Sequence, residues 1–191
     1  MIKNGAMIRQ SRLLHNALLW PALLAMSVFI VSGMMHILVT WTGPQAQQSQ
    51  PPRSTFSASE WVALPALLQR HGIGNAVVAK LVPSHVGNVL QVTVDDKTPR
   101  HYIALNSGEA LPDYDQQHAL WLARHYLGNP AAEPVAVEFL QTFDSSYPWV
   151  NRLLPVYRFR FGGADNLTVT VHTETGALAD ISNDWKRSVQ N

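Results

Sequence analysis

The sequence of 191 residues contains no cysteine and few charged side chains. The absence of cysteine excludes disulfides, thiolate metal sites and a cysteine nucleophile. Charged residues make up 14% of the chain, apolar residues make up 47%, and the formal net charge is +1. Nucleic-acid-binding surfaces need a basic patch or stripe, and no such stripe occurs in this sequence. The composition therefore argues against a nucleic-acid partner.

The scarcity of charge is concentrated near the N-terminus, because no Lys, Arg, Asp or Glu lies between Arg12 and Arg53. Within this gap, residues 13–41 form an apolar run that exceeds the roughly 20 helical residues needed to cross a bilayer. We therefore predict a transmembrane helix over residues 13–41, with Trp20 and Trp41 as interfacial aromatic side chains.

The charges that flank this run predict its orientation. Lys3, Arg9 and Arg12 precede it, whereas residues 42–52 carry no charge. Because positive residues are enriched on the cytoplasmic side, we expect residues 1–12 to be cytoplasmic and the rest of the chain to lie outside a bacterial inner membrane. A cleavable signal peptide is the alternative, but its apolar core is shorter, about 7–15 residues, and ends in a small-residue cleavage site.

The part that follows begins with a linker at residues 42–53, which is rich in Gln and Pro and lacks apolar periodicity. Ser57 and Glu60 have the spacing of a capping box ahead of a helix that ends at His71. Strand patterns then follow at residues 76–82, 89–94 and 101–105. This order predicts a first module of one helix and three strands over residues 54–112.

A second stretch, residues 113–187, repeats this order. A helix is predicted over residues 115–127, and strands are predicted at residues 135–142, 155–161 and 167–173. Aligning residues 102–111 with residues 168–178 places a strand, a polar turn and an apolar exit in both. We therefore predict the fold class α+β, with one N-terminal transmembrane helix and two tandem modules. Each module consists of a helix on a three-stranded antiparallel sheet, and residues 188–191 form a tail.

The second stretch resembles a known family. Residues 153–187, which include LPVYRFRFGGADNLTVTVHTETGALADISNDWKR, resemble the C-terminal half of a PepSY domain. Residues 143–156 (FDSSYPWVNRLLPV) and 32–41 (SGMMHILVTW) resemble the wider family of PepSY-associated transmembrane proteins. The chain departs from the family at residues 170–176, where relatives often have Tyr-Val-Asp-Pro before the turn glycine. Many relatives also continue into further transmembrane helices, so the chain is expected to be a natural short form or a truncated reading frame.

The resemblance implies two alternative functions. Members of the family are linked to the inhibition or holding of proteases and peptides. Multi-helix forms are linked to haem-bearing membrane reductases that serve iron and siderophore uptake. We expect a non-catalytic, membrane-anchored protein whose paired modules bind a protein or peptide partner, and the alternative is a haem-binding accessory of such a reductase.

His15 and His36 are the candidate haem ligands. Imidazoles in a transmembrane helix are costly and are often retained for function. Their spacing separates them by roughly 31 Å along a helix and about 60° around it, which places one near each membrane face. Paired imidazoles are common axial ligands of haem. Each haem would need a second ligand from a homodimer or a partner subunit, and the alternative is that both side chains are interfacial.

Tyr147, Trp149 and Tyr157 are the candidate partner-binding residues. These aromatic residues surround Pro148 and Pro155, and one interpretation is that they line a sheet edge that adds an extended peptide as a further strand. The alternative is that they are core aromatics that close the sheet.

No other pattern carries chemistry. His118 and His125 are expected to be surface histidines, and His101 and His172 are expected to face solvent in alternating strands. No nucleophile elbow, phosphate-binding loop or zinc-protease motif occurs. The sequence therefore predicts no catalytic residue and no metal site.

Overall fold

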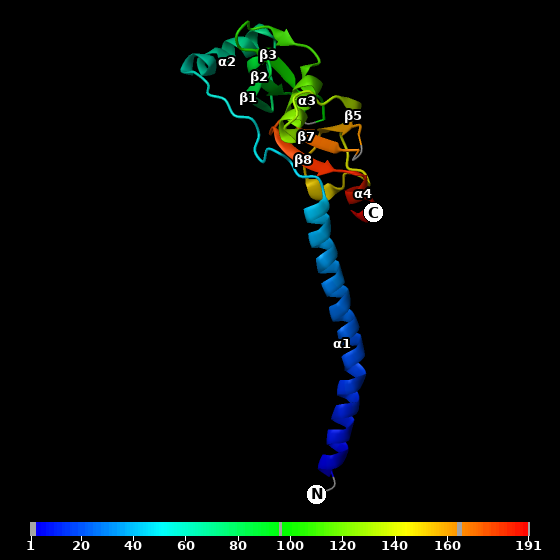
Figure 1. Ribbon diagram of the computed structural model, residues 1–191. Helices are drawn as coiled ribbons and strands as arrows, with labels where there is room; N and C mark the ends of the chain where they lie inside the picture. The colour runs from blue at the N-terminus through cyan, green and yellow to red at the C-terminus, as the bar shows by residue number, and fades with distance from the viewer. Residues whose placement is uncertain (1–2, 96, 164–165, 191) are drawn as a thin grey trace. The chain divides into compact units, whose positions relative to one another are not determined.

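The computed structural model of the chain describes residues 3–95, 97–163 and 166–190. It divides into two compact units, Met1–Gly43 and Pro44–Asn191. The first consists of a single helix, α1 (Lys3–Thr42), and the second contains the sheets and the remaining helices (Figure 1).

Helix α1 is long and apolar enough to cross a membrane, over Met7–Thr42. These 36 residues span about 54 Å at about 1.5 Å per residue, which exceeds the bilayer core of about 30 Å. The large apolar side chains of the helix are exposed along its whole length, Trp20 and Trp41 among them. The predicted span over residues 13–41 is thus confirmed as a candidate membrane helix, and the helix also includes the basic residues before it.

The unit Pro44–Asn191 contains two antiparallel sheets, each preceded by a helix. The first stretch comprises α2 (Ala58–Arg70), β1 (Val78–Ser84), β2 (Gly87–Thr93), β3 (His101–Ala104) and β4 (Ala110–Leu111). The second comprises α3 (Tyr114–Leu127), β5 (Pro134–Leu140), the 3-10 turn η1 (Trp149–Asn151), β6 (Val156–Phe161), β7 (Thr168–His172), β8 (Ala177–Ser182) and α4 (Asp184–Gln190). The strands follow chain order in both sheets, β1-β2-β3-β4 and β5-β6-β7-β8.

Each sheet has four strands, so the prediction of three-stranded sheets is wrong. The apolar segments that follow the two predicted polar turns are the fourth strands, β4 and β8. They form because the chain turns back at Gly108 and Gly176 and pairs with the preceding strand. Both glycines have φ of +69°, a left-handed conformation that a side chain disfavours. Strand β4 has only two residues, too few to show an alternating pattern.

The predicted capping box at the start of α2 is confirmed. The backbone N–H of Ser57 donates to Glu60 Oε2 at 2.6 Å, and the N–H of Glu60 donates to Ser57 Oγ at 3.3 Å. Glu60 Oε1 also accepts from Asn88 Nδ2 at 2.9 Å. The cap therefore satisfies backbone N–H groups at the start of α2 and also ties this start to strand β2.

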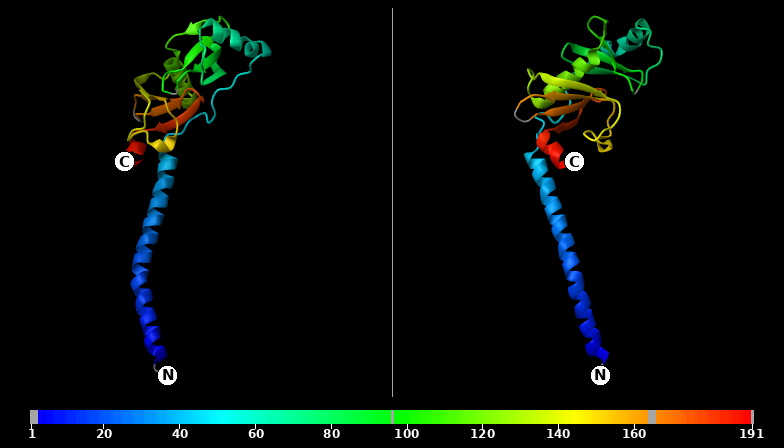
Figure 2. Two further views of the ribbon diagram at one scale, coloured as in Figure 1. Left: turned by 180° about the vertical axis from the view of Figure 1, so that it is seen from behind. Right: turned by 90° about the vertical axis from the view of Figure 1, so that its right-hand side faces the viewer.

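Helix α3 lies between the two sheets, as Figures 1 and 2 show. Leu122 and Tyr126 pack against the second sheet. On another side of the helix, the Tyr114 ring packs edge-to-face against Tyr102 of the first sheet, and the His118 ring packs against Tyr102 at a tilt. The face of the first sheet opposite α3 is covered by α2, through leucine side chains at positions 64, 67 and 68. One helix thus contributes to the cores of both sheets.

The predicted linker is held against this unit. We call residues 44–56 the linker strap. The N–H of Gln47 donates to Tyr126 O at 2.8 Å, and the His125 Nε2 atom lies 3.0 Å from Gln50 O. Farther along, Ser54 Oγ donates to Asn88 Oδ1 at 2.9 Å. The strap therefore runs from the C-terminal end of α3 to the β1–β2 hairpin.

The position of α3 makes a testable prediction. Leu122→Ala should lower the free energy of unfolding by about 2–5 kcal/mol, because it removes a fully buried side chain and leaves a cavity between α3 and the second sheet. Val62→Ala, at an exposed position of α2, is the matched control and should change it by less than about 0.5 kcal/mol. Denaturant unfolding of the full chain in detergent measures both values, and equal effects would contradict the packing described.

Candidate functional site

Strand β5 is an open edge of the second sheet. It pairs with β6 on one side, and no strand in the described part of the chain pairs with its other side. The edge exposes apolar side chains, since Val135 is 68% exposed and Val137 is 36% exposed. Edge strands present unpaired backbone N–H and C=O groups that can bind a further strand.

The other three sheet edges are less accessible. Strand β8 packs against α4, and strand β4 has only two residues. Strand β1 borders the linker strap at Pro51 and Pro52. Among the described strands, β5 is thus the edge best suited to bind a peptide.

The three aromatic residues predicted to bind a partner differ in exposure. Tyr147 is fully buried, and its hydroxyl donates to Leu153 O at 3.0 Å. Tyr157 is buried in β6, an inner strand, with its ring 4.8 Å from that of Phe139 in β5. Burial raises the pKa of Tyr147 to about 12, and burial also raises the pKa of Tyr157. Tyr147 and Tyr157 are therefore core aromatics, as the second interpretation of the sequence holds, and the interpretation that they line an exposed edge is wrong for these two.

Trp149 is the member of this set that can contact a partner, since it is 69% exposed. It lies in η1, within the loop of residues 141–155 that connects β5 to β6 (Figure 2, right). Arg158 fixes this loop, because its guanidinium contacts Asp144 Oδ2 at 3.2 Å and Glu138 Oε2 of β5 at 3.0 Å. An exposed tryptophan is therefore held on an anchored loop that follows the open edge. The sequence contains these aromatics but not the direction in which each side chain points.

A groove of about 670 Å³ lies along α3. Leu120 and Trp121 supply apolar walls, and Arg124 and His125 supply polar ones. No carboxylate is among its described lining residues. The volume falls within the range of small-molecule sites, about 300–1,000 Å³.

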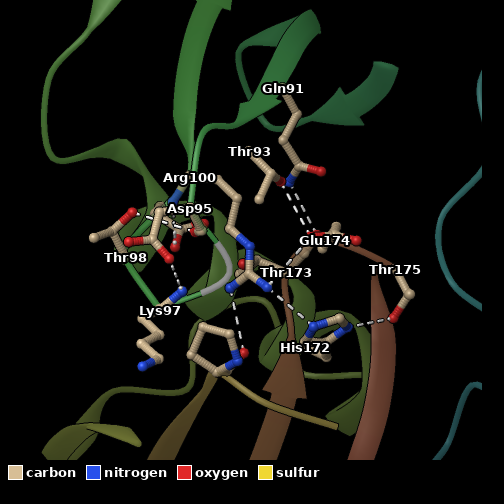
Figure 3. A network of polar contacts seen from close by, with 12 residues as sticks. Gln91, Thr93, Asp95, Lys97, Thr98, Arg100, His172, Thr173, Glu174 and Thr175 are labelled. Carbon is tan, nitrogen blue, oxygen red and sulfur yellow. Dashed lines mark hydrogen bonds and ion pairs between the residues drawn. The ribbon is translucent and has the colours of Figure 1, made fainter. Parts of the chain in front are cut away.

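A network of buried polar side chains joins the two sheets (Figure 3). We call it the polar junction, and Arg100 is its centre. Arg100 is only 4% exposed; Nη1 donates to Pro155 O at 3.2 Å, and Nη2 donates to His172 Nε2 at 3.0 Å. The same Nη2 atom lies 3.7 Å from Glu174 Oε2. A cation that directly precedes β3 thus contacts groups of the second stretch through both of its Nη atoms.

Two further side chains, Asp115 and Gln91, extend the polar junction. Asp115, at the start of α3, accepts from the N–H of Arg100 at 3.1 Å and from the Tyr102 hydroxyl at 2.7 Å. Gln91 Nε2 donates to the same hydroxyl at 2.7 Å and to Thr173 O at 2.9 Å. These groups bind one another across the sheets, which favours a structural role for the polar junction over a catalytic one.

Two histidines expected on the surface are buried. His172 lies in the polar junction, and burial together with the Arg100 charge lowers its pKa to about 4. Its Nε2 accepts from Arg100, so Nδ1 carries the proton and donates to Thr175 Oγ1 at 2.8 Å. The His118 side chain of α3 packs against Tyr102 of the first sheet and is 2% exposed. Burial lowers its pKa to about 3. The expectations for His118 and His172 are therefore wrong, because α3 and β7 are covered on both sides.

The two candidate haem ligands lie on α1. His15 and His36 are both exposed on the helix surface, 21 residues apart. No group of three or more His, Asp or Glu side chains suited to a metal occurs among the residues that the structure describes. A haem at either position would still need an imidazole from another helix, so haem binding stays a prediction.

No protein-family model, curated protein or solved structure matches the chain. The resemblance to the PepSY family therefore stays a prediction, carried by the residues quoted above.

The polar junction predicts a large difference between two arginines. Arg100→Ala should lower the free energy of unfolding by about 3–5 kcal/mol, because it leaves the buried partners of a charged group unsatisfied. Arg160→Ala removes a half-exposed arginine that lies 3.7 Å from Glu138, and should cost no more than about 1 kcal/mol. Urea titration of the two variants measures the difference, and similar losses would show that the buried contacts contribute little.

The buried histidines predict how stability depends on pH. Their folded-state pKa values, about 3 for His118 and about 4 for His172, lie below the unfolded value near 6.5. In the range between, the unfolded chain binds more protons than the folded chain, so stability rises with pH. Their contribution is fully present above about pH 6.5 and is lost as the pH falls toward about 4. Urea unfolding from pH 7 to pH 4 should show this decline, and the slope should be smaller in His172→Gln; an identical slope would contradict the assignment.

Proposed function

We propose that this protein is a non-catalytic binding protein of a bacterial inner membrane. Helix α1 anchors it, residues 1–12 are cytoplasmic, and the unit Pro44–Asn191 is extracytoplasmic. There the open edge of β5 captures an extended segment of a protein or peptide partner. The single observation that carries this proposal is the unpaired outer side of β5, among the described strands, together with its exposed valines.

The chemistry of the edge supports an extended peptide as the occupant. Backbone groups supply affinity in such an addition, and pockets for alternate side chains supply selectivity. The register of β5 is irregular between Pro134 and Ala136, and its regular part, residues 136–140, extends over about 16 Å, enough to pair with a short strand. Glu138 is the one charged side chain in the strand, and it already contacts Arg158. The exposed edge therefore favours a peptide with apolar side chains.

The repeated order of elements supports the tandem interpretation. In both stretches a helix precedes a meander of four strands, and a left-handed glycine makes the last turn, Gly108 in one and Gly176 in the other. Two PepSY-like modules, over residues 54–112 and 113–187, would account for this order. A role in holding peptides or proteases, which the PepSY resemblance implies, agrees with an edge that adds a strand.

Partner capture is tested by placing a photoreactive residue at position 137 of β5 in cells and, as a control, at position 62 of α2, which is also exposed. Crosslinks to a partner should form at position 137 and be absent at position 62. A synthetic peptide covering the crosslinked segment should bind the full chain, and a Val135→Lys, Val137→Lys variant should bind it at least about tenfold more weakly. Equal crosslinking at both positions, or unchanged peptide affinity, would contradict the proposal.

The orientation can be tested directly because the chain contains no cysteine. Single cysteines are introduced at two exposed serines, as Ser11→Cys in α1 and Ser107→Cys in the β3–β4 turn. In intact spheroplasts, a membrane-impermeant maleimide should label Ser107→Cys and spare Ser11→Cys until the membrane is opened. Labelling of Ser11→Cys alone would reverse the orientation.

A further inference from the structure

A cavity of about 100 Å³ lies beneath the linker strap. Pro51 and Pro52 of the strap line one part of it, Lys80 of β1 and His118 of α3 line others, and the β7–β8 turn at residues 173–176 completes it. The cavity is distinct from the β5 edge, because none of its lining residues belongs to β5 or to the loop after it.

Two residues that line this cavity carry buried polar atoms without a hydrogen-bond partner among the described residues. These atoms are Nδ1 of His118 and Oγ1 of Thr173. Both side chains are almost completely buried. A buried polar group without a partner costs about 1–3 kcal/mol, so such groups are rare unless a bound molecule satisfies them. Two of them at one small cavity indicate a site for a polar ligand.

The charge at the cavity favours an anion. Lys80 is half-buried, and no salt bridge joins it to a carboxylate within the described ranges of the chain. Glu174 is the carboxylate that lines the cavity, and it already contacts Arg100 at 3.7 Å and accepts from Thr93 Oγ1 at 3.1 Å. Burial lowers the pKa of Lys80, and the charge of Glu174 opposes this effect. The ammonium group of Lys80 thus lacks a carboxylate of its own in a partly desolvated position.

We propose that this cavity binds a small monovalent carboxylate, held by the Lys80 ammonium group and by the N–H and O–H donors of His118 and Thr173. The neutral imidazole of His118 supplies a donor in the tautomer that carries its proton on Nδ1. The cavity has room for roughly three water molecules, which is also the size of a two-carbon carboxylate. Water alone would satisfy the two polar atoms but would leave Lys80 without a carboxylate at ion-pair distance.

The test uses the full chain in detergent with ¹⁵N-labelled histidine, and sodium acetate as the probe. The His118 imidazole signals, assigned by their loss in His118→Gln, are followed during titration with acetate and, separately, with sodium chloride at the same ionic strength. The proposal predicts a saturable shift of the His118 signals with acetate only. It also predicts that acetate raises the midpoint of thermal unfolding relative to chloride, because a ligand that binds the folded state stabilises it.

Two lysine variants give the matched comparison. Lys80→Met should abolish the saturable shift, while Lys97→Met, at an exposed lysine, should leave it unchanged. The signals of the other seven histidines report whether each variant is folded. The same linear drift with acetate and chloride in the wild-type chain, with no difference in unfolding midpoint, would show that the cavity holds water only and would overturn the proposal. A saturable shift that persists in folded Lys80→Met would also overturn it.

Discussion

The burial of α3 between two sheets is the constraint on which the rest of this structure depends. A helix with one apolar face can complete one sheet, but Leu122 and Tyr126 pack on the second sheet while Tyr114 and His118 pack on the first. Burial of α3 also removes polar groups near its N-terminal end from solvent, and these groups need hydrogen-bond partners within the protein. Asp115 provides such a partner by accepting from Arg100 and Tyr102 of the first sheet.

The polar junction follows from that constraint. Arg100 is buried, and its two Nη atoms donate to atoms of the second stretch, Pro155 O and His172 Nε2. Its Nε atom has no hydrogen-bond partner among the described residues. Loss of alignment between the sheets would break these contacts together and leave a buried charge, which is costly. The charged and aromatic residues around α3 thus hold the two sheets together. This packing fixes the positions of the β5 edge and of the cavity under the linker strap.

The sequence predicted the parts of the fold that depend on local patterns. The apolar run before Arg53, the capping box of Ser57 and Glu60, and the order of a helix followed by strands all depend on residues close together in the chain. The fourth strands were missed because a two-residue strand has no periodicity and because a turn glycine shows where a chain turns, but not whether it then pairs. The site was less predictable. The burial of Tyr147, Tyr157 and the two inner histidines depends on what covers each strand and helix, which is a property of the tertiary packing.

The proposed function depends on a membrane anchor and an open sheet edge. Helix α1 has the length and composition of a membrane span. The other described sheet edges of the unit Pro44–Asn191 are less accessible to a partner. Strand β8 packs against α4, β1 borders the linker strap, and β4 has only two residues. An edge strand can bind a peptide only if its sheet is rigid. Helix α3 and the polar junction hold the second sheet in place.

Amide hydrogen exchange of the full chain tests this central claim most directly. If α3 and the polar junction join the sheets into one cooperative unit, the protected amides of β2 and β3 and those of β6 and β7 should open with the same free energy, and Arg100→Met should lower both sets equally. Separate opening free energies for the two sheets, or a loss of protection confined to the first sheet in Arg100→Met, would contradict it.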